Sequence, residues 1–272
     1  SAASDVYKRQ ILEGGNERHQ ALMKQFYEKY NCGKCKRIQE LGDEGTLISG
    51  IRVVQHKDYS FTWHMKEYAD KMHTIDRPRG WLTNTSELTD KDFEDIQTVN
   101  GKIGWIGGNG RPDLAAGHSI IAGQYKHKSP ALVSQCNDCV KRAKENKVVM
   151  KVWVIAPENL RMVMFCDSAF DHSGERHQQG WIIGFTNQYL NSNEKAPVSI
   201  ALWKSRKLAR KASSPQLVET FACSYGLADA FWVRCLLWSS LYSDYDYVDK
   251  QPAHIAFPVR EPTCLLYTSP SP

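Results

Sequence analysis

The sequence has no apolar run that approaches the roughly 20 residues needed for a membrane-spanning helix. Its first ten residues have no apolar core of the kind that signal peptides carry. The eight cysteines are spread along 272 residues without the density of a secreted disulfide scaffold. We therefore expect an intracellular protein, cytoplasmic or nuclear and in a reducing compartment, with no membrane partner.

The chain also lacks a strong excess of charge of either sign. Its net charge is +5, with 42% hydrophobic and 24% charged residues, which is an ordinary composition for a globular protein. A mild basic excess permits a phosphate-rich partner but does not require one. No internal repeat is present, and the length fits one large domain or two small ones.

The cysteines include two C-x-x-C pairs, Cys32 with Cys35 and Cys136 with Cys139. Two such pairs can form a tetrahedral zinc site, although the gap of roughly a hundred residues greatly exceeds the usual spacing. The second pair also falls at helical spacing with neighbouring apolar residues, which favours core positions on a helix. These neighbours are Leu132, Val133, Val140 and Ala143.

The first part of the chain shows mainly helical periodicity. It predicts helices over 16–30, 66–73, 89–101 and 129–146, strands over 46–55 and 59–63, and a linker over 77–87. Thr89, followed three residues later by Asp92, is typical of a helix cap. The glycine-rich stretch 101–110 separates two predicted helices, but it lacks the Lys-Ser/Thr ending of a P-loop and follows no clear strand.

After residue 158 the periodicity changes to that of strands. Three apolar runs, 161–166, 180–186 and 198–203, precede an amphipathic helix over about 215–240. This order predicts an α/β (α+β) fold, an antiparallel meander packed under a long helix. The predicted buried stripe of that helix is Leu217, Phe221, Ala228, Trp232, Cys235 and Ser239.

Two carboxylates fall at positions that can hold a metal. Asp167 ends the first predicted strand, and Glu219 lies in the first turns of the long helix. Mg²⁺ prefers oxygen ligands, and two such ions can activate water and stabilise the leaving oxygen of a phosphodiester. The plainer alternative is a turn aspartate and a glutamate that stabilises a helix N-terminus.

A basic segment, residues 204–211, lies between the last predicted strand and the helix. If this loop contacts a nucleic-acid backbone, its cations bind phosphates; otherwise it is a solvated basic surface. The residues concerned are Lys204, Arg206, Lys207, Arg210 and Lys211.

An ordered series of motifs carries a family resemblance. The motifs are CDSAF at 166–170, Gly180, WKSRK at 203–207, the segment 214–222, FWVRCLL at 231–237, and upstream Gly101, Trp105, RPDL at 111–114, LISGI at 47–51 and Tyr68. Over residues 11–245 the chain resembles copia-type retrotransposon polyproteins, from the end of the reverse transcriptase through the connection into RNase H. The resemblance implies that Asp167 and Glu219 are catalytic Mg²⁺ ligands and that the basic segment holds an RNA–DNA hybrid.

The sequence departs from that family pattern in several places. The paired polymerase aspartates expected just before residues 12–15 are absent, Leu217 and Thr220 replace a glutamate and a tyrosine, and the strand with the third RNase H aspartate does not follow. Asp244, Asp246 and Asp249 fall in the loop after the helix instead. Residues 1–10 and 265–272 resemble translated sequencing adapters, so we expect a truncated reading frame.

The resemblance also predicts how the chain is divided. The expected segments are an adapter-like tail at 1–10, a reverse-transcriptase remnant at 11–85, a helical connection at 86–157, a partial RNase H-like domain at 158–245, and a loop with a second adapter-like tail at 246–272. The expected function is that of a fragment of an RNA-directed DNA polymerase and ribonuclease H polyprotein, inactive as truncated. The partners would be a hybrid or other nucleic acid and the rest of the polyprotein. The alternatives are a non-enzymatic, degenerate nucleic-acid-binding module and a protein held together by zinc at the two C-x-x-C pairs.

Overall fold

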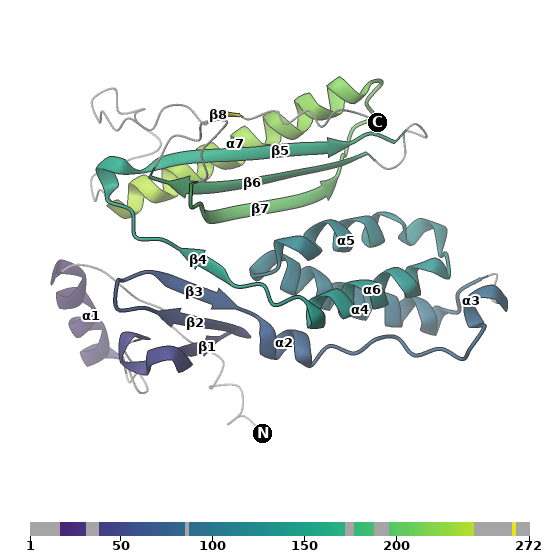
Figure 1. Ribbon diagram of the computed structural model, residues 1–272, viewed down its shortest axis with the longest axis horizontal. Coiled ribbons are helices and arrows are strands. Elements are labelled where there is room, and N and C mark those ends of the chain that lie inside the picture. The colour runs from purple at the N-terminus through teal and green to yellow at the C-terminus, as the bar shows by residue number, and fades with distance from the viewer. Residues whose placement is uncertain are drawn as a thin grey trace.

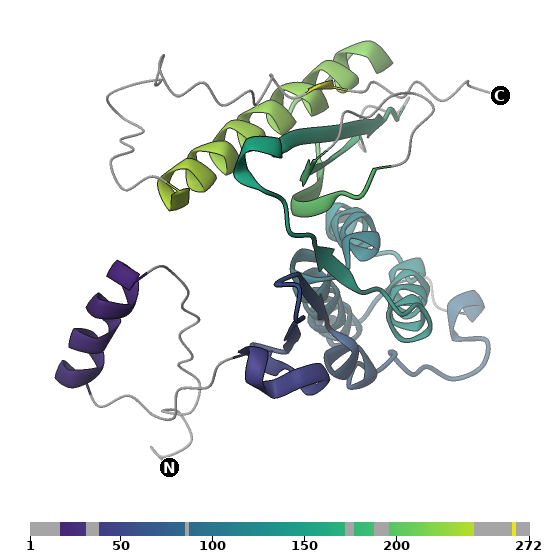
Figure 2. The same ribbon diagram turned by 60° about the vertical axis from the view of Figure 1, so that its left-hand side comes forward.

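The computed structural model describes residues 17–30, 38–84, 87–171, 177–187, 196–241 and 263–264. These residues form α-helices and two four-stranded sheets, as Figures 1 and 2 show from two directions. The mixture of helices with antiparallel strands confirms the broad α/β expectation. Among the helices of the described ranges, none is both long enough and apolar enough to cross a bilayer.

The first sheet is antiparallel, with strands in the order β1-β2-β3-β4. The strands are β1 (Thr46–Ile48), β2 (Ile51–Gln55), β3 (Phe61–His64) and β4 (Met150–Val152). The single strand predicted over 46–55 is a hairpin instead, because Ser49 and Gly50 have φ angles of 50° and 84° that turn the chain back. Helix α1 (Glu17–Lys29), at the predicted place, and a 3-10 segment η2 (Ile38–Glu44) precede this sheet.

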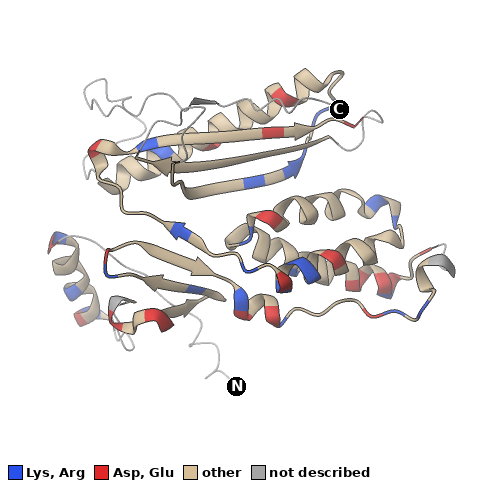
Figure 3. Cartoon of the chain, viewed as in Figure 1, with Lys and Arg blue, Asp and Glu red and all other residues tan. Residues whose placement is uncertain are grey.

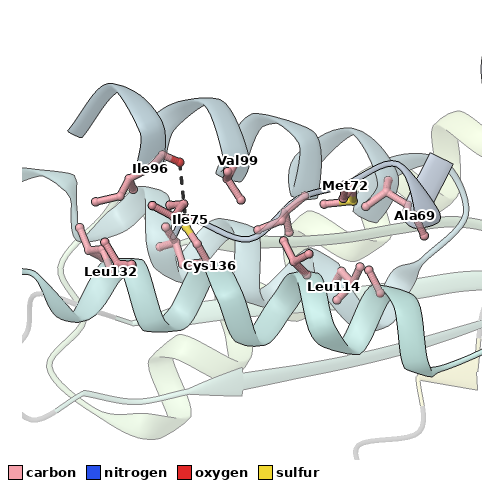
Figure 4. Packing of buried hydrophobic residues seen from close by; sticks show 14 of the residues in the cluster. Ala69, Met72, Ile75, Ile96, Val99, Leu114, Leu132 and Cys136 are labelled. Carbon is pink, nitrogen blue, oxygen red and sulfur yellow. Dashed lines mark hydrogen bonds between the residues drawn. The ribbon is translucent and has the colours of Figure 1, made fainter. Parts of the chain in front are cut away.

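The other elements of the first half of the chain are helical, and these helices form its hydrophobic core. They are α2 (Lys66–Asp70), α3 (Trp81–Asn84), α4 (Asp90–Asn109), α5 (Pro112–Gly123), the 3-10 turn η3 (Tyr125–His127) and α6 (Ala131–Glu145). Figure 4 shows the buried side chains that meet between α2, α4, α5 and α6. The short helix α3 lies within the segment predicted to be a linker.

The core does not divide at residue 85. Met65, Ala69 and Met72 share one buried cluster with Ile96 and Leu132. Strand β4 also pairs directly with β3, although the helices separate the two strands in the sequence. The proposed remnant 11–85 and connection 86–157 therefore share both a hydrophobic core and a sheet.

Helix α4 begins as the sequence predicts. The Thr89 hydroxyl accepts from the backbone N–H of Asp92, and the Asp92 carboxylate accepts from the Thr89 backbone N–H at 3.0 Å. This reciprocal capping box satisfies N–H groups that a helix start would otherwise leave unpaired. Arg77 also contacts the Asp92 carboxylate at 2.7 Å.

The prediction that the glycine-rich stretch 101–110 separates two helices is wrong, because α4 continues through it to Asn109. A Cβ on Gly104 would lie 2.6 Å from the His118 ring, and one on Gly107 would lie 3.2 Å from the backbone of Ala115. The glycines therefore let α4 and α5 approach closely, and this tertiary contact outweighs the low helix propensity of glycine.

The second sheet contains the predicted meander. Strands β5 (Arg161–Ala169), β6 (Gln178–Thr186) and β7 (Ser199–Lys207) pair antiparallel, and β8 (Thr263–Cys264) pairs parallel with β5. The short 3-10 turn η4 (Pro157–Asn159) leads into β5. The change to strand periodicity after residue 158 is thus confirmed.

Helix α7 (Pro215–Leu241) covers one face of this sheet, on the side away from α4–α6 in Figures 1 and 2. The stripe predicted for it is wrong by about one position. Ala228, Trp232 and Ser239 are exposed, and the buried residues are Val218, Ala222, Gly226, Ala230, Val233 and Trp238. In the middle of the helix, small residues face the sheet because the approach there is close; a Cβ on Gly226 would lie 2.8 Å from the Met164 sulfur.

Polar contacts join the two halves, one from β7 to α4 and one from β6 to α5. The Trp203 indole N–H donates to the Gly107 carbonyl at 2.7 Å, and the Gln178 amide donates to the Ser119 hydroxyl at 2.8 Å. The face of the second sheet opposite α7 therefore packs against the helices of the first half.

Candidate metal and nucleic-acid site

Asp167 lies near the end of the central strand β5, where its backbone faces Gly180 of β6. Its carboxylate is exposed and accepts from the backbone N–H of Ser168 at 2.8 Å. Met164 and Cys166 belong to the buried cluster beneath α7. Because successive side chains of a strand point to opposite faces, Asp167 leaves the sheet on the face away from α7.

Glu219 lies in the second turn of α7 and is half-buried, next to the fully buried Val218. The helix start is capped by Ser214, whose hydroxyl accepts from the backbone N–H of Leu217 at 3.3 Å. A carboxylate this close to a helix N-terminus is favoured by the helix dipole without any metal.

The two carboxylates lie at the same end of the sheet. Gly226 of α7 lies on Met164, and the C-terminal end of the helix meets Leu160 and Met162 at the start of β5. The helix therefore runs antiparallel to the strand. Glu219 is roughly 10 Å before Gly226 along the helix, and Asp167 is roughly 10 Å beyond Met164 along the strand.

The two carboxylates are thus level along the sheet but on different faces of it. The described residues contain no group of three or more His, Cys, Asp or Glu side chains arranged to hold a metal ion. The predicted convergence of Asp167 and Glu219 on a shared ion stays a prediction. Asp244, Asp246 and Asp249 lie outside the described residues.

The basic segment 204–211 is not a loop throughout. Lys204, Arg206 and Lys207 belong to β7, so their side chains alternate between faces. Lys204 and Arg206 lie on the α7 face, and Lys207 lies on the face towards Gly123 of α5. Figure 3 shows basic residues along β7. Only Arg210 and Lys211, both exposed, lie in the connection to α7. The predicted cluster is therefore divided between two faces and a loop.

A polar network that was not predicted from the sequence lies on the α7 face. Asp229 of α7 accepts from the Trp181 indole N–H at 2.7 Å and binds the Lys204 ammonium at 2.8 Å. The Arg206 guanidinium lies 4.3 Å from the centre of the Tyr225 ring and 5.0 Å from that of Trp181. Lys204 is thus already paired with a carboxylate, whereas Arg206 rests on aromatic rings with its side chain open to solvent.

Near the start of β6, two buried side chains that were not predicted from the sequence each have a polar atom without a partner in the described part of the chain: His177 and Gln179. His177 accepts the Asp171 backbone N–H on Nδ1 at 3.0 Å, which puts the proton of the neutral ring on Nε2. Neither His177 Nε2 nor Gln179 Oε1 has a hydrogen-bond partner among the described residues. Strand alternation places Gln179 on the α7 face, opposite Arg206.

Both cysteines of the second C-x-x-C pair lie on α6 as predicted, but only Cys136 belongs to the core, and Cys139 is partly buried against it. Cys136 is fully buried on α6 among Leu132, Val133 and Val140, and burial raises the pKa of its thiol to about 12. Cys139 is half-buried, and burial raises the pKa of its thiol as well. Cys32 and Cys35 lie outside the described residues.

No protein-family model matches this chain, and a search of curated proteins finds no match.

Proposed function

We propose that the chain is a fragment of a copia-type retrotransposon polyprotein, whose intact form copies RNA into DNA and degrades the RNA strand of the hybrid. One observation supports this most. A meander of three nine-residue strands is followed by a 27-residue helix that packs across it, with Asp167 and the helix N-terminus at the same end. The order of these strands and this helix along the chain is the same as the order of the motifs that carry the resemblance to copia-type polyproteins.

In the intact parent, Asp167 and Glu219 would be Mg²⁺ ligands. In this chain the fit is poor, because their positions on opposite faces do not form a site for two ions roughly 4 Å apart. We therefore assign no hydrolytic step to it, and we propose that it is inactive as a nuclease.

The function proposed for this chain alone is to hold a hybrid backbone by charge. Arg210 and Lys211 are exposed in the connection that follows β7, and Arg206 near the end of β7 is held in place by the Trp181 and Tyr225 rings. A planar guanidinium held on aromatic rings loses little side-chain entropy when it binds a phosphate. Lys204 contributes less, because Asp229 neutralises it.

The test is binding of a labelled RNA–DNA hybrid across a range of salt concentrations. Each lost phosphate contact lowers the slope of log affinity against log salt by about 0.9 for a duplex. Arg210→Gln with Lys211→Gln should therefore weaken binding and reduce the slope by about one to two. A matched pair, Lys141→Gln with Lys144→Gln on the exposed face of α6, removes the same charge elsewhere. Equal effects from both pairs would mean that only net charge matters.

Cleavage is measured in the same mixtures with Mg²⁺ added. We expect an intact hybrid after incubation. Cleavage that disappears in Asp167→Asn would refute the proposed inactivity.

The second candidate is a non-enzymatic, degenerate module that binds nucleic acid. The separation of Asp167 and Glu219 onto different faces favours it. Sequencing an intact copy of the locus distinguishes the two candidates, since a fragment of an active parent requires that all missing carboxylates be present there.

A further inference from the structure

The outward face of α7 carries one acidic residue, Glu219 near the helix N-terminus, and is otherwise made of apolar and small polar side chains over five turns. Two neighbouring rows of residues form it, each spaced by four along the helix. The first row is Thr220, Ser224, Ala228, Trp232, Leu236 and Ser240, and all six are exposed. The second includes Glu219 and the exposed Leu227 and Phe231, and the Arg234 guanidinium lies 4.9 Å from the centre of the Phe231 ring. No member of the first row carries a charge.

This face exposes more apolar surface than a solvated helix normally does. Trp232 is 55% exposed, Phe231 51%, Leu236 46% and Leu227 41%. A buried aromatic residue covers roughly 150–250 Å², so the free parts of these side chains amount to several hundred Å². A contiguous apolar patch of that size marks an interaction site more often than plain surface.

The first row is self-complementary. Its N-terminal half is small, with Ser224 and Ala228, and its C-terminal half is large, with Trp232 and Leu236. When two such helices run antiparallel, Trp232 of each copy meets Ala228 of the other, and Leu236 meets Ser224. Both pairs are centred on position 230, so one two-fold axis produces both at once.

We propose that two copies of this chain associate through antiparallel packing of their α7 helices. A two-fold arrangement requires each copy to present the same surface. On this surface, the large side chains of one copy pack against the small side chains of the other. Because the first row carries no charge, its packing on the same row of a second copy leaves no unpaired ion at the centre of the contact, and Glu219 and Arg234 stay beside it. Together with the exposed Thr220, Ser224, Ala228 and Ser240 of the first row, two copies that cover each other's patch approach the roughly 1,200 Å² at which specific interfaces begin.

The experiment measures the mass of the purified chain by analytical ultracentrifugation over a dilution series. We expect a reversible dimer of twice 31.0 kDa at high concentration. Trp232→Ala should weaken the dimer on the order of 30-fold, as the loss of an aromatic anchor does. Ala228→Trp should weaken it too, although it adds apolar surface, because two indoles then occupy one space.

The decisive variant combines the two changes. With Ala228→Trp and Trp232→Ala together, a large residue again faces a small one, so dimerisation should recover to within a few-fold of the wild type. The exchange of Ser224→Leu with Leu236→Ser repeats this test at the second pairing. Leu22→Ala, at a 57% exposed leucine on α1, is the control and should change nothing.

Three outcomes would overturn the proposal. If the wild-type chain remains monomeric at high concentration, the partner of this face is not a second copy. A different partner, such as the rest of the polyprotein, would then cover it. A double variant weaker than either single variant excludes this register. Aggregation that rises with Ala228→Trp indicates non-specific association. Circular dichroism of each variant confirms that α7 is formed.

Discussion

Two alanines on the same helix should respond in opposite ways to the same substitution. Ala222 is fully buried between α7 and the second sheet, whereas Ala228 is exposed. The helical periodicity of the sequence alone places Ala228, and not Ala222, in the buried stripe. Ala222→Leu and Ala228→Leu therefore test directly which face of α7 covers the sheet.

The expected magnitude follows from the space around Ala222. Leucine adds three carbons, each of which would gain about 0.8 kcal/mol if room existed. One turn away, however, a single Cβ on Gly226 would already lie 2.8 Å from the Met164 sulfur. The helix must then move away from the sheet, and such overpacking costs about 1–3 kcal/mol.

At Ala228 the added leucine enters solvent, and the two residues have similar helix propensities. We expect its free energy of unfolding to stay within about 0.5 kcal/mol of the wild type. Urea denaturation at low micromolar concentration, where self-association does not contribute, measures both variants. A neutral Ala222→Leu together with a destabilising Ala228→Leu would refute the packing described above and restore the periodicity-based stripe.

Two further predictions concern ionisable groups. The hydrogen bond from the Thr89 hydroxyl lowers the pKa of Asp92, so the carboxylate stabilises the fold above its ordinary pKa near 4, and that contribution is lost as pH falls through the lowered value. Thr89→Ala should cost about 1 kcal/mol at neutral pH, and thermal melts should show a smaller loss of stability on acidification; an unchanged pH profile would contradict the capping box. Because burial raises the pKa of the Cys136 thiol to about 12, iodoacetamide should label it at neutral pH only after unfolding, and rapid labelling of the folded protein, located by peptide mass mapping, would contradict its burial.

Local chemistry determined the parts of this protein that the sequence predicted. The capping box at Thr89, the helical placement of Cys136 and the meander after residue 158 all depend on neighbours within a few positions. Such short-range patterns of capping and periodicity are present in the chain itself before it folds.

Tertiary contacts decided the rest. Gly104 and Gly107 favour a break by propensity, yet they lie inside α4, because only glycine lets that helix approach α5 so closely. The buried face of α7 is likewise set by how closely Ala222 and Gly226 approach the sheet, and this leaves Trp232 on the outer side of the helix. The order of the strands and the helix predicts that Asp167 and Glu219 lie at the same end of the sheet. The tertiary structure decides the rest: α7 packs on one face of the sheet, and the Asp167 side chain leaves β5 on the other face. A strand reverses its side-chain direction at every residue, so that choice depends on which face the helix covers.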